Sequence, residues 1–133
     1  MRYFLDTDIC IYALEDSDSP FYRRLSVMGP SRIAIPAIVE AELVLGALKS
    51  EQKEHNLATI ESFLRPFDII PFSHECTLAY ARIRADLEST GTIIGANDLI
   101  IAATVVANDG VLVSHNVDEF RRVEGLAVQD WTR

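Results

Sequence analysis

Cysteine and positive charge are both scarce in this sequence. Only two of its 133 residues are cysteines, Cys10 and Cys76, which are too few for a disulfide framework and show no metal-site spacing. We therefore expect both thiols to be reduced and packed. Twelve basic residues stand against twenty acidic ones, and the formal net charge of −8 argues against binding of nucleic acid by general electrostatics alone. A polyanionic substrate would need cations supplied from elsewhere.

The sequence also lacks a long apolar run. Its longest uncharged segment, Leu99 to Asn108, is about half as long as a membrane-spanning helix. The N-terminus passes directly into Tyr3-Phe4-Leu5, without the basic region or cleavage site of a targeting peptide. We therefore expect a soluble, cytoplasmic protein with no membrane partner. Its length, with 49% hydrophobic and 24% charged residues, fits a single domain over residues 1–133.

Short apolar segments alternate with helical patterns along the chain. Strands are predicted at residues 2–5, 33–35, 68–72, 111–113 and 126–128. Helices are predicted at residues 9–14, 21–28, 36–48, 57–64, 73–88, 98–107 and 116–122. The inner side of the fifth helix is assigned to Leu78, Ala81, Ile83 and Leu87. This alternation predicts an α/β fold with a mostly parallel sheet of four or five strands, covered on both faces, whose ligands bind at the carboxyl ends of the strands.

Two aspartates are expected at that edge of the sheet. Asp98 precedes nine residues that contain no charge and one hydroxyl, a pattern typical of a buried helix. We expect Asn97 to be the N-cap of this helix and Asp98 to lie in its first turn, where the helix dipole favours a negative charge. Asp6 directly follows the first strand, and it could equally serve as the cap of the next helix.

The helix after the second strand carries two candidate glutamates. Glu40 and Glu42 are two residues apart and therefore lie on nearly opposite sides of the helix, so only one of them can point inward. Spacing does not decide between them. Glu40 lines up with Glu51 and Glu54 on what looks like a solvent side, whereas the missing side chain of Gly46 leaves room near Glu42.

The segment from Ser114 to Glu119 follows the fourth strand and has two interpretations. Asn116 as N-cap and Glu119 three residues later make a capping box, in which Glu119 would serve only the helix. Alternatively, the acids after Asn116 join those at the sheet edge. His115 could bind a metal, but a histidine without a second is more typical of hydrogen bonding or packing.

The acids gather at one place in this scheme. Asp6, Asp98 and the acids after Asn116 all project to the same edge, with Glu42 close behind. Like charges in one place destabilise a fold unless a cation lies among them. Oxygen ligands with at most one histidine suit Mg²⁺ or Mn²⁺ better than zinc.

Four segments, in this order and spacing over essentially the whole chain, carry a resemblance to a known family. They are Phe4-Leu5-Asp6-Thr7-Asp8-Ile9, then Ala41-Glu42-Leu43 with Gly46, then Gly95-Ala96-Asn97-Asp98-Leu99-Ile100-Ile101-Ala102, and last His115-Asn116-Val117-Asp118-Glu119-Phe120 with Gly125-Leu126 and Asp130-Trp131. The sequence resembles the PIN-domain ribonucleases, and closely the VapC toxins. The resemblance implies a three-layer α/β/α fold and an Mg²⁺- or Mn²⁺-dependent endoribonuclease.

The family's site residues map onto particular acids here. The resemblance assigns metal binding and catalysis to Asp6, Glu42 and Asp98, and so chooses Glu42 over Glu40. A subgroup of VapC toxins has a glutamate before phenylalanine, which matches Glu119, whereas many PIN domains have an aspartate at the position of Asn116; Asp118 is a further acid in this segment. Asp8 departs from the asparagine usual in the family, and its role stays open.

The resemblance also implies partners. Toxins of this family form homodimers, cleave RNA and are blocked by a cognate antitoxin. Apolar stripes on the helices from Ile38 to Leu48 and Leu57 to Leu64 are the surfaces where such an antitoxin would bind. Candidates for guiding the RNA backbone are Arg82, Arg84, Arg121 and Arg122.

Two other functions remain as alternatives. A strand ending in Asp6-Thr7-Asp8 also resembles the first motif of haloacid-dehalogenase-type phosphatases, in which the first aspartate is the nucleophile and the second a general acid. Such enzymes need a lysine at the site, and the only lysines here, Lys49 and Lys53, lie in a polar break far from any strand end. The other alternative is a PIN-like interaction module without catalysis.

Overall fold

The computed structural model, which describes residues 1–132, contains a five-stranded parallel sheet with strand order β3-β2-β1-β4-β5. The strands are β1 (Tyr3–Leu5), β2 (Ile33–Pro36), β3 (Asp68–Ile70), β4 (Val111–Val113) and β5 (Ala127–Gln129). The predicted mostly parallel sheet is thereby confirmed. β3 ends at Ile70, two residues before the predicted end, because Pro71 cannot donate a hydrogen bond to a neighbouring strand; β3 is an edge strand.

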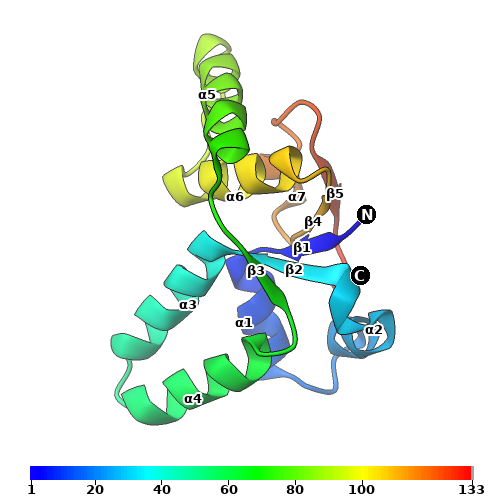
Figure 1. The fold of residues 1–133 in the computed structure, drawn as a ribbon, viewed down its shortest axis with the longest axis vertical. Helices are drawn as coiled ribbons and strands as arrows, with labels where there is room; N and C mark the ends of the chain where they lie inside the picture. Colours follow the sequence, from blue (N-terminus) through cyan, green and yellow to red (C-terminus); the bar gives the residue numbers. More distant parts are fainter. Residues whose placement is uncertain (133) are drawn as a thin grey trace.

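Helices cover both faces of this sheet. They are α1 (Thr7–Glu15), α2 (Pro20–Met28), α3 (Ala37–Leu48), α4 (Lys53–Leu64), α5 (His74–Ser89), α6 (Ala96–Ala107) and α7 (Val117–Phe120), with a short 3-10 helix at Pro30–Arg32. Figure 1 shows α5 and α6 on one side of the sheet and α1, α3 and α4 on the other. The expected three-layer α/β/α architecture is therefore present.

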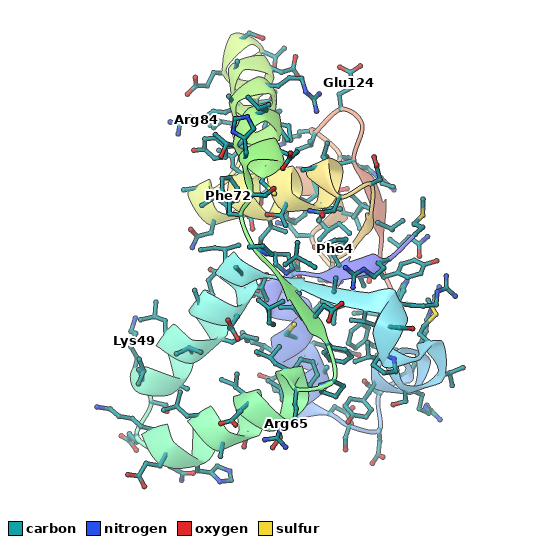
Figure 2. All side chains as sticks on the ribbon, in the orientation of Figure 1. Phe4, Lys49, Arg65, Phe72, Arg84 and Glu124 are labelled. Carbon is teal, nitrogen blue, oxygen red and sulfur yellow. The ribbon has the colours of Figure 1, made fainter. Side chains whose placement is uncertain are left out.

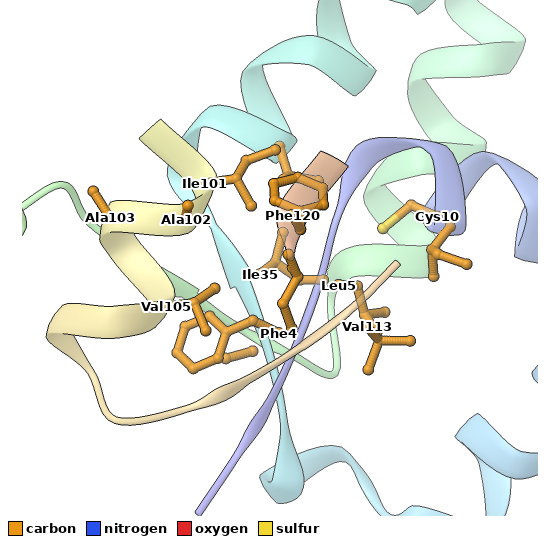
Figure 3. Close-up of a cluster of buried hydrophobic side chains, with 14 of the residues drawn as sticks. Phe4, Leu5, Cys10, Ile35, Ile101, Ala102, Ala103, Val105, Val113 and Phe120 are labelled. Atoms are coloured by element: carbon orange, nitrogen blue, oxygen red, sulfur yellow. The ribbon is translucent and has the colours of Figure 1, made fainter. Parts of the chain in front are cut away.

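The core lies between the sheet and α6. The central strands are apolar throughout, and Phe4, Leu5 and Leu112 are almost completely buried. Figure 3 shows Phe4, Ile35 and Val105 within the buried cluster that joins the strands to α6. All residues of α6 from Ile101 to Val105 are buried, which confirms the buried helix predicted from its apolar sequence.

The inner side of α5 was predicted wrongly in part. Leu78 is 60% exposed and Ala81 is exposed, whereas Ile83 and Leu87 are buried as expected. The buried side is completed by Cys76 and Ala79, since the spacing of 76, 79, 83 and 87 follows one face of a helix. α5 packs mainly on α6, and Figure 2 shows it projecting from the body with Arg84 outside. Because α5 projects from the body, only the narrow face formed by these four residues is buried.

The expectation that both thiols are reduced and packed is borne out. Cys10 and Cys76 are both free and buried. Within residues 1–132, every helix is too short or too polar to cross a membrane.

Candidate active site

Parallel strands bring Asp6 and the segment after β4 together. β1 pairs with β4 so that Leu5 lies opposite Val113, and the backbone N–H of Asp6 donates to the carbonyl of Val113 at 3.3 Å. The Oδ1 of Asp6 accepts from the N–H of Ile9 at 2.9 Å, so Asp6 is the N-cap of α1. Asp6 therefore lies at the sheet edge and also caps α1, so both predicted roles apply to it.

The Asp6 carboxylate is unusually basic. The side chain is only 5% exposed, and burial is the main cause that raises its pKa from 3.8 to about 6. Hydrogen bonds from Ser114 and Ile9 act in the opposite direction. The charges of Asp8 and Glu42 raise the pKa further, so negative charge is already crowded at this point.

Asp98 lies in the first turn of α6, as predicted, but the predicted cap is wrong. α6 begins at Ala96 with Gly95 as its N-cap, so Asn97 lies inside the first turn. Burial, followed by the hydrogen bond and charge of Glu119, raises the pKa of Asp98 to about 7. The charges of Asp6 and Glu42 add to this rise. Asp98 therefore interacts with every other candidate carboxylate of the site.

The side chain of Asn97 holds Glu42 instead of capping a helix. Its Nδ2 donates to Glu42 Oε2 at 3.1 Å, and the Oγ1 of Thr7 donates to Glu42 Oε1 at 2.6 Å. Both oxygens of Glu42 are thus fixed by neighbours from α1 and α6. This clamp was not predicted from the sequence, because Asn97 was assigned a capping role and Thr7 none.

Glu40 does not approach the other acids. It is half-buried and lines a cavity of about 560 Å³ between α3 and α4, together with Val44 and Leu57, so the expected solvent side is wrong. The α3–α4 hairpin covers that face of the helix. Gly46 lines a different cavity, together with Ile11, and Glu42 is not among the residues that line it.

Glu119 connects α7 to α6. Its Oε1 accepts from the N–H of Gly95 at 3.2 Å, and its Oε2 accepts from Asn116 Nδ2 at 2.6 Å. Of the two interpretations of this segment, the capping box is wrong, because the Asn116 side chain makes no cap hydrogen bond to α7. Glu119 serves the N-terminus of α6 instead, where it meets Asp98.

Asp98 and Glu119 shift each other's pKa in opposite directions. The hydrogen bond from Asp98 is the main cause that lowers the pKa of Glu119, whereas the same contact raises that of Asp98. Asp98 is therefore the donor and Glu119 the ionised acceptor. A Cβ placed on Gly95 would lie 3.4 Å from Asp98 Oδ2 and 3.9 Å from Glu119 Oε1, so both carboxylates stand beside this glycine.

The other acids of these segments stay outside the group. Asp8 is exposed and acts on Asp6 only through its charge. The Asp118 side chain is fully exposed, 3.9 Å from Arg121. Asn116 touches the group only as the donor to Glu119.

The donor set fits a hard divalent cation. The candidate ligands are carboxylate oxygens from four elements, and burial and mutual repulsion raise the pKa of two of them. A divalent cation would remove that repulsion. Within residues 1–132, no three Asp, Glu, His or Cys side chains are grouped closely enough to hold a metal as they stand. Glu42 and Glu119 accept hydrogen bonds from neutral donors in this arrangement.

Known proteins resemble this chain over its whole length. The model of the PIN domain family matches residues 3–126. Ribonuclease VapC2 of Rickettsia felis is 41% identical and covers 100% of both chains. The tRNA(fMet)-specific endonuclease VapC of Salmonella typhimurium is 31% identical over 98% of both. The chain is also similar to the crystal structure of VapBC2 from Rickettsia felis bound to a DNA fragment from their promoter, with a TM-score of 0.92 and 40% identity over 98% of this chain and 99% of that one.

Proposed function

This chain belongs to the PIN domain family, among its VapC ribonucleases, and we propose that it is an Mg²⁺- or Mn²⁺-dependent endoribonuclease that acts as the toxin of a toxin–antitoxin pair. The residues proposed to hold the metal and carry catalysis are Asp6, Glu42, Asp98 and Glu119. One observation supports the proposal most strongly: Asp98 interacts with each of the other three carboxylates at the carboxyl edge of the sheet.

The side chains of this edge have separable roles in hydrolysis. A bound divalent cation supplies an acidified water and neutralises charge on the scissile phosphate. Asp6, fixed by the N–H of Ile9, presents its carboxylate from the end of β1. Thr7 and Asn97 orient Glu42 from two sides. Asp98 and Glu119 would hold the cation as anionic ligands, and the N-terminus of α6 would stabilise the charge of Asp98 in its first turn.

Cleavage of RNA by the purified chain tests this function. Unfractionated tRNA is a suitable first substrate, because the Salmonella typhimurium relative is named as specific for a tRNA. We expect internal cuts with Mg²⁺ or Mn²⁺, none in EDTA, and recovery when excess metal is restored. Cleavage that persists in EDTA would contradict the metal mechanism.

The same preparation separates the alternative functions. Release of phosphate from small phosphoesters, with a phospho-enzyme trapped at Asp6, would favour the phosphatase. Lys49 is the C-cap of α3 and lies at the outer end of this helix (Figure 2). The 12 residues of α3 extend about 18 Å from the sheet edge, so Lys49 does not lie near Asp6. A folded protein that cuts no RNA under any metal condition would favour a non-catalytic module.

We propose a cognate antitoxin and a second copy of this chain as its protein partners. The solved relatives from Rickettsia felis and Salmonella typhimurium are described as VapBC bound to DNA. The apolar cavity between α3 and α4, lined by Val44, Leu57 and Ile60, is the proposed antitoxin surface. Leu45 and Leu48 remain 55% and 47% exposed on the same hairpin.

The Glu42 clamp gives a first testable prediction. Thr7→Val and Asn97→Ala each remove one hydrogen bond to Glu42 without removing a carboxylate, and we expect each to weaken Mn²⁺ binding about 10-fold to 100-fold. Isothermal titration measures the affinity. Thr59→Val is the matched control, because the Thr59 hydroxyl donates to the carbonyl of His55 within α4 and not to a carboxylate of the site. Wild-type affinity in both clamp variants would show that Glu42 needs no such orientation.

A further inference from the structure

A polar cavity adjoins the acidic group on the side of α7. It has a volume of about 360 Å³, within the range of roughly 300–1,000 Å³ usual for ligand sites. The loop between β4 and α7 and the residues after β5 form its walls. Asn116 lines this cavity and also donates to Glu119, so the cavity opens beside the proposed metal ligands. Its lining residues are His115, Asn116, Val117, Asp118, Arg121 and Asp130.

His115 is held in one orientation at the wall of this cavity. Its Nδ1 lies 3.2 Å from Asp130 Oδ2 and 3.1 Å from the hydroxyl of Thr132. Although burial acts to raise it, hydrogen bonds from Thr132 and His115 lower the pKa of Asp130, which is therefore an ionised acceptor. An ionised partner at Nδ1 selects the tautomer with the proton on Nδ1. Nε2 is then an acceptor, and within residues 1–132 it has no hydrogen-bond partner.

Arg121 supplies a cation to the same cavity. Of the four arginines considered for guiding RNA, Arg84 is bonded to Tyr80 and Glu88, and Arg122 donates to the carbonyl of Ile93. Arg82 lines a small separate cavity that also contains two acids, Asp86 and Glu124. Among residues 1–132, the one salt-bridge partner of Arg121 is the fully exposed Asp118 at 3.9 Å, and Arg121 lines the cavity beside the acidic group. Arg122 acts on Glu119 through its charge, whereas a phosphate bound in the cavity itself would meet Arg121.

We propose that this cavity binds a ribonucleotide next to the scissile phosphate, with Nε2 of His115 accepting from its 2′-hydroxyl and Arg121 donating to its phosphate. The inference rests on the proposed ribonuclease function and adds to it a site that reads the sugar. A 2′-hydroxyl is the group by which a protein distinguishes RNA from DNA, and an imidazole with a free acceptor nitrogen matches its donor. The guanidinium forms charge-assisted hydrogen bonds with phosphate oxygens.

Protein substitutions combined with 2′-deoxy substitutions in the RNA test this site. The cut made by the wild-type enzyme in unfractionated tRNA is first mapped, and synthetic RNAs spanning it then carry one 2′-deoxy substitution on either side of the cut. We expect His115→Ala to raise KM about 5-fold to 10-fold while kcat changes less than 2-fold. One of the deoxy substrates should raise the wild-type KM by the same factor and have no further effect on His115→Ala.

Arg121→Ala provides a second, independent readout. It should raise KM similarly and reduce the slope of log KM against log salt by about 0.7, as expected for one lost phosphate contact on a single strand. His74→Ala and Arg65→Ala remove exposed side chains of the same types on α5 and α4 and should leave KM unchanged. Melting temperatures of all four variants should match the wild type.

The possible failures can be told apart. If the wild-type enzyme cuts no RNA with metal, the proposed function fails and this inference with it. If it cuts RNA but His115→Ala keeps the wild-type KM, the inference is overturned while the function stands. The same holds if both deoxy substrates affect His115→Ala as much as they affect the wild type.

Discussion

Asp98→Asn is expected to lower the rate of RNA cleavage about a thousandfold or more while the protein stays folded. The amide has the size of the carboxylate but carries no charge. Asp98 is the residue that interacts with all three other carboxylates, so its loss removes the centre of the proposed metal site. Initial rates of cleavage at saturating Mn²⁺ measure the effect, and circular dichroism with thermal melting measures the fold.

The control for this prediction is Asp86→Asn. Asp86 is an exposed aspartate on α5, and its substitution removes the same charge from the same protein at a distance from the sheet edge. Its cleavage rate should stay within about 2-fold of the wild type. Asp98→Asn with more than a tenth of the wild-type rate would contradict the assigned role.

Asp6→Asn is expected to stabilise the metal-free protein at pH 8. The difference between a pKa of 3.8 and one of about 6 corresponds to about 3 kcal/mol of unfavourable free energy when the buried carboxylate is ionised. Asparagine is neutral, and its Oδ1 can still accept from the N–H of Ile9. Since about 1 kcal/mol shifts the melting temperature of a domain of this size by roughly 3–5 °C, we expect a rise of about 9–15 °C.

The pH dependence of this effect has a definite sign. The folded state holds a proton on Asp6 between pH 3.8 and about 6 that the unfolded state releases, so wild-type stability falls as pH rises through this window. The advantage of Asp6→Asn should therefore be full at pH 8 and absent near pH 3.5. Excess Mn²⁺ should raise the wild-type melting temperature but not that of Asp6→Asn. A lower melting temperature of metal-free Asp6→Asn at pH 8 would refute the account of a buried, strained charge.

The sheet and its edge could be predicted because their signal is local. Short apolar runs followed by acids at Asp6 and after Val113 identify parallel strands and the side on which polar groups emerge. The apolar run after Asp98 likewise identifies α6 as buried. Each of these features follows from burial of a continuous segment, so no distant contact is needed to infer it.

The contacts within the site could not be predicted, because they join residues far apart in the sequence. Asn97 was assigned to a cap by its residue type, but the helix begins earlier and frees its amide for Glu42, 55 residues away. A local capping box was one of two interpretations of Glu119, yet its carboxylate accepts from the N–H of Gly95, the N-cap of α6, across 24 residues. Helical spacing also left Glu40 and Glu42 equivalent, and only the family resemblance selected Glu42. Local propensities describe helix ends well but give no information on tertiary partners.

Direct titration with Mn²⁺ tests the central claim, that these four carboxylates form one divalent-metal site. Calorimetry on the metal-free wild-type protein at pH 8 should show saturable binding. Asp98→Asn, folded and at the same concentration, should bind at least about 100-fold more weakly. Equal Mn²⁺ affinity in the two proteins would place the metal elsewhere and contradict the proposed site.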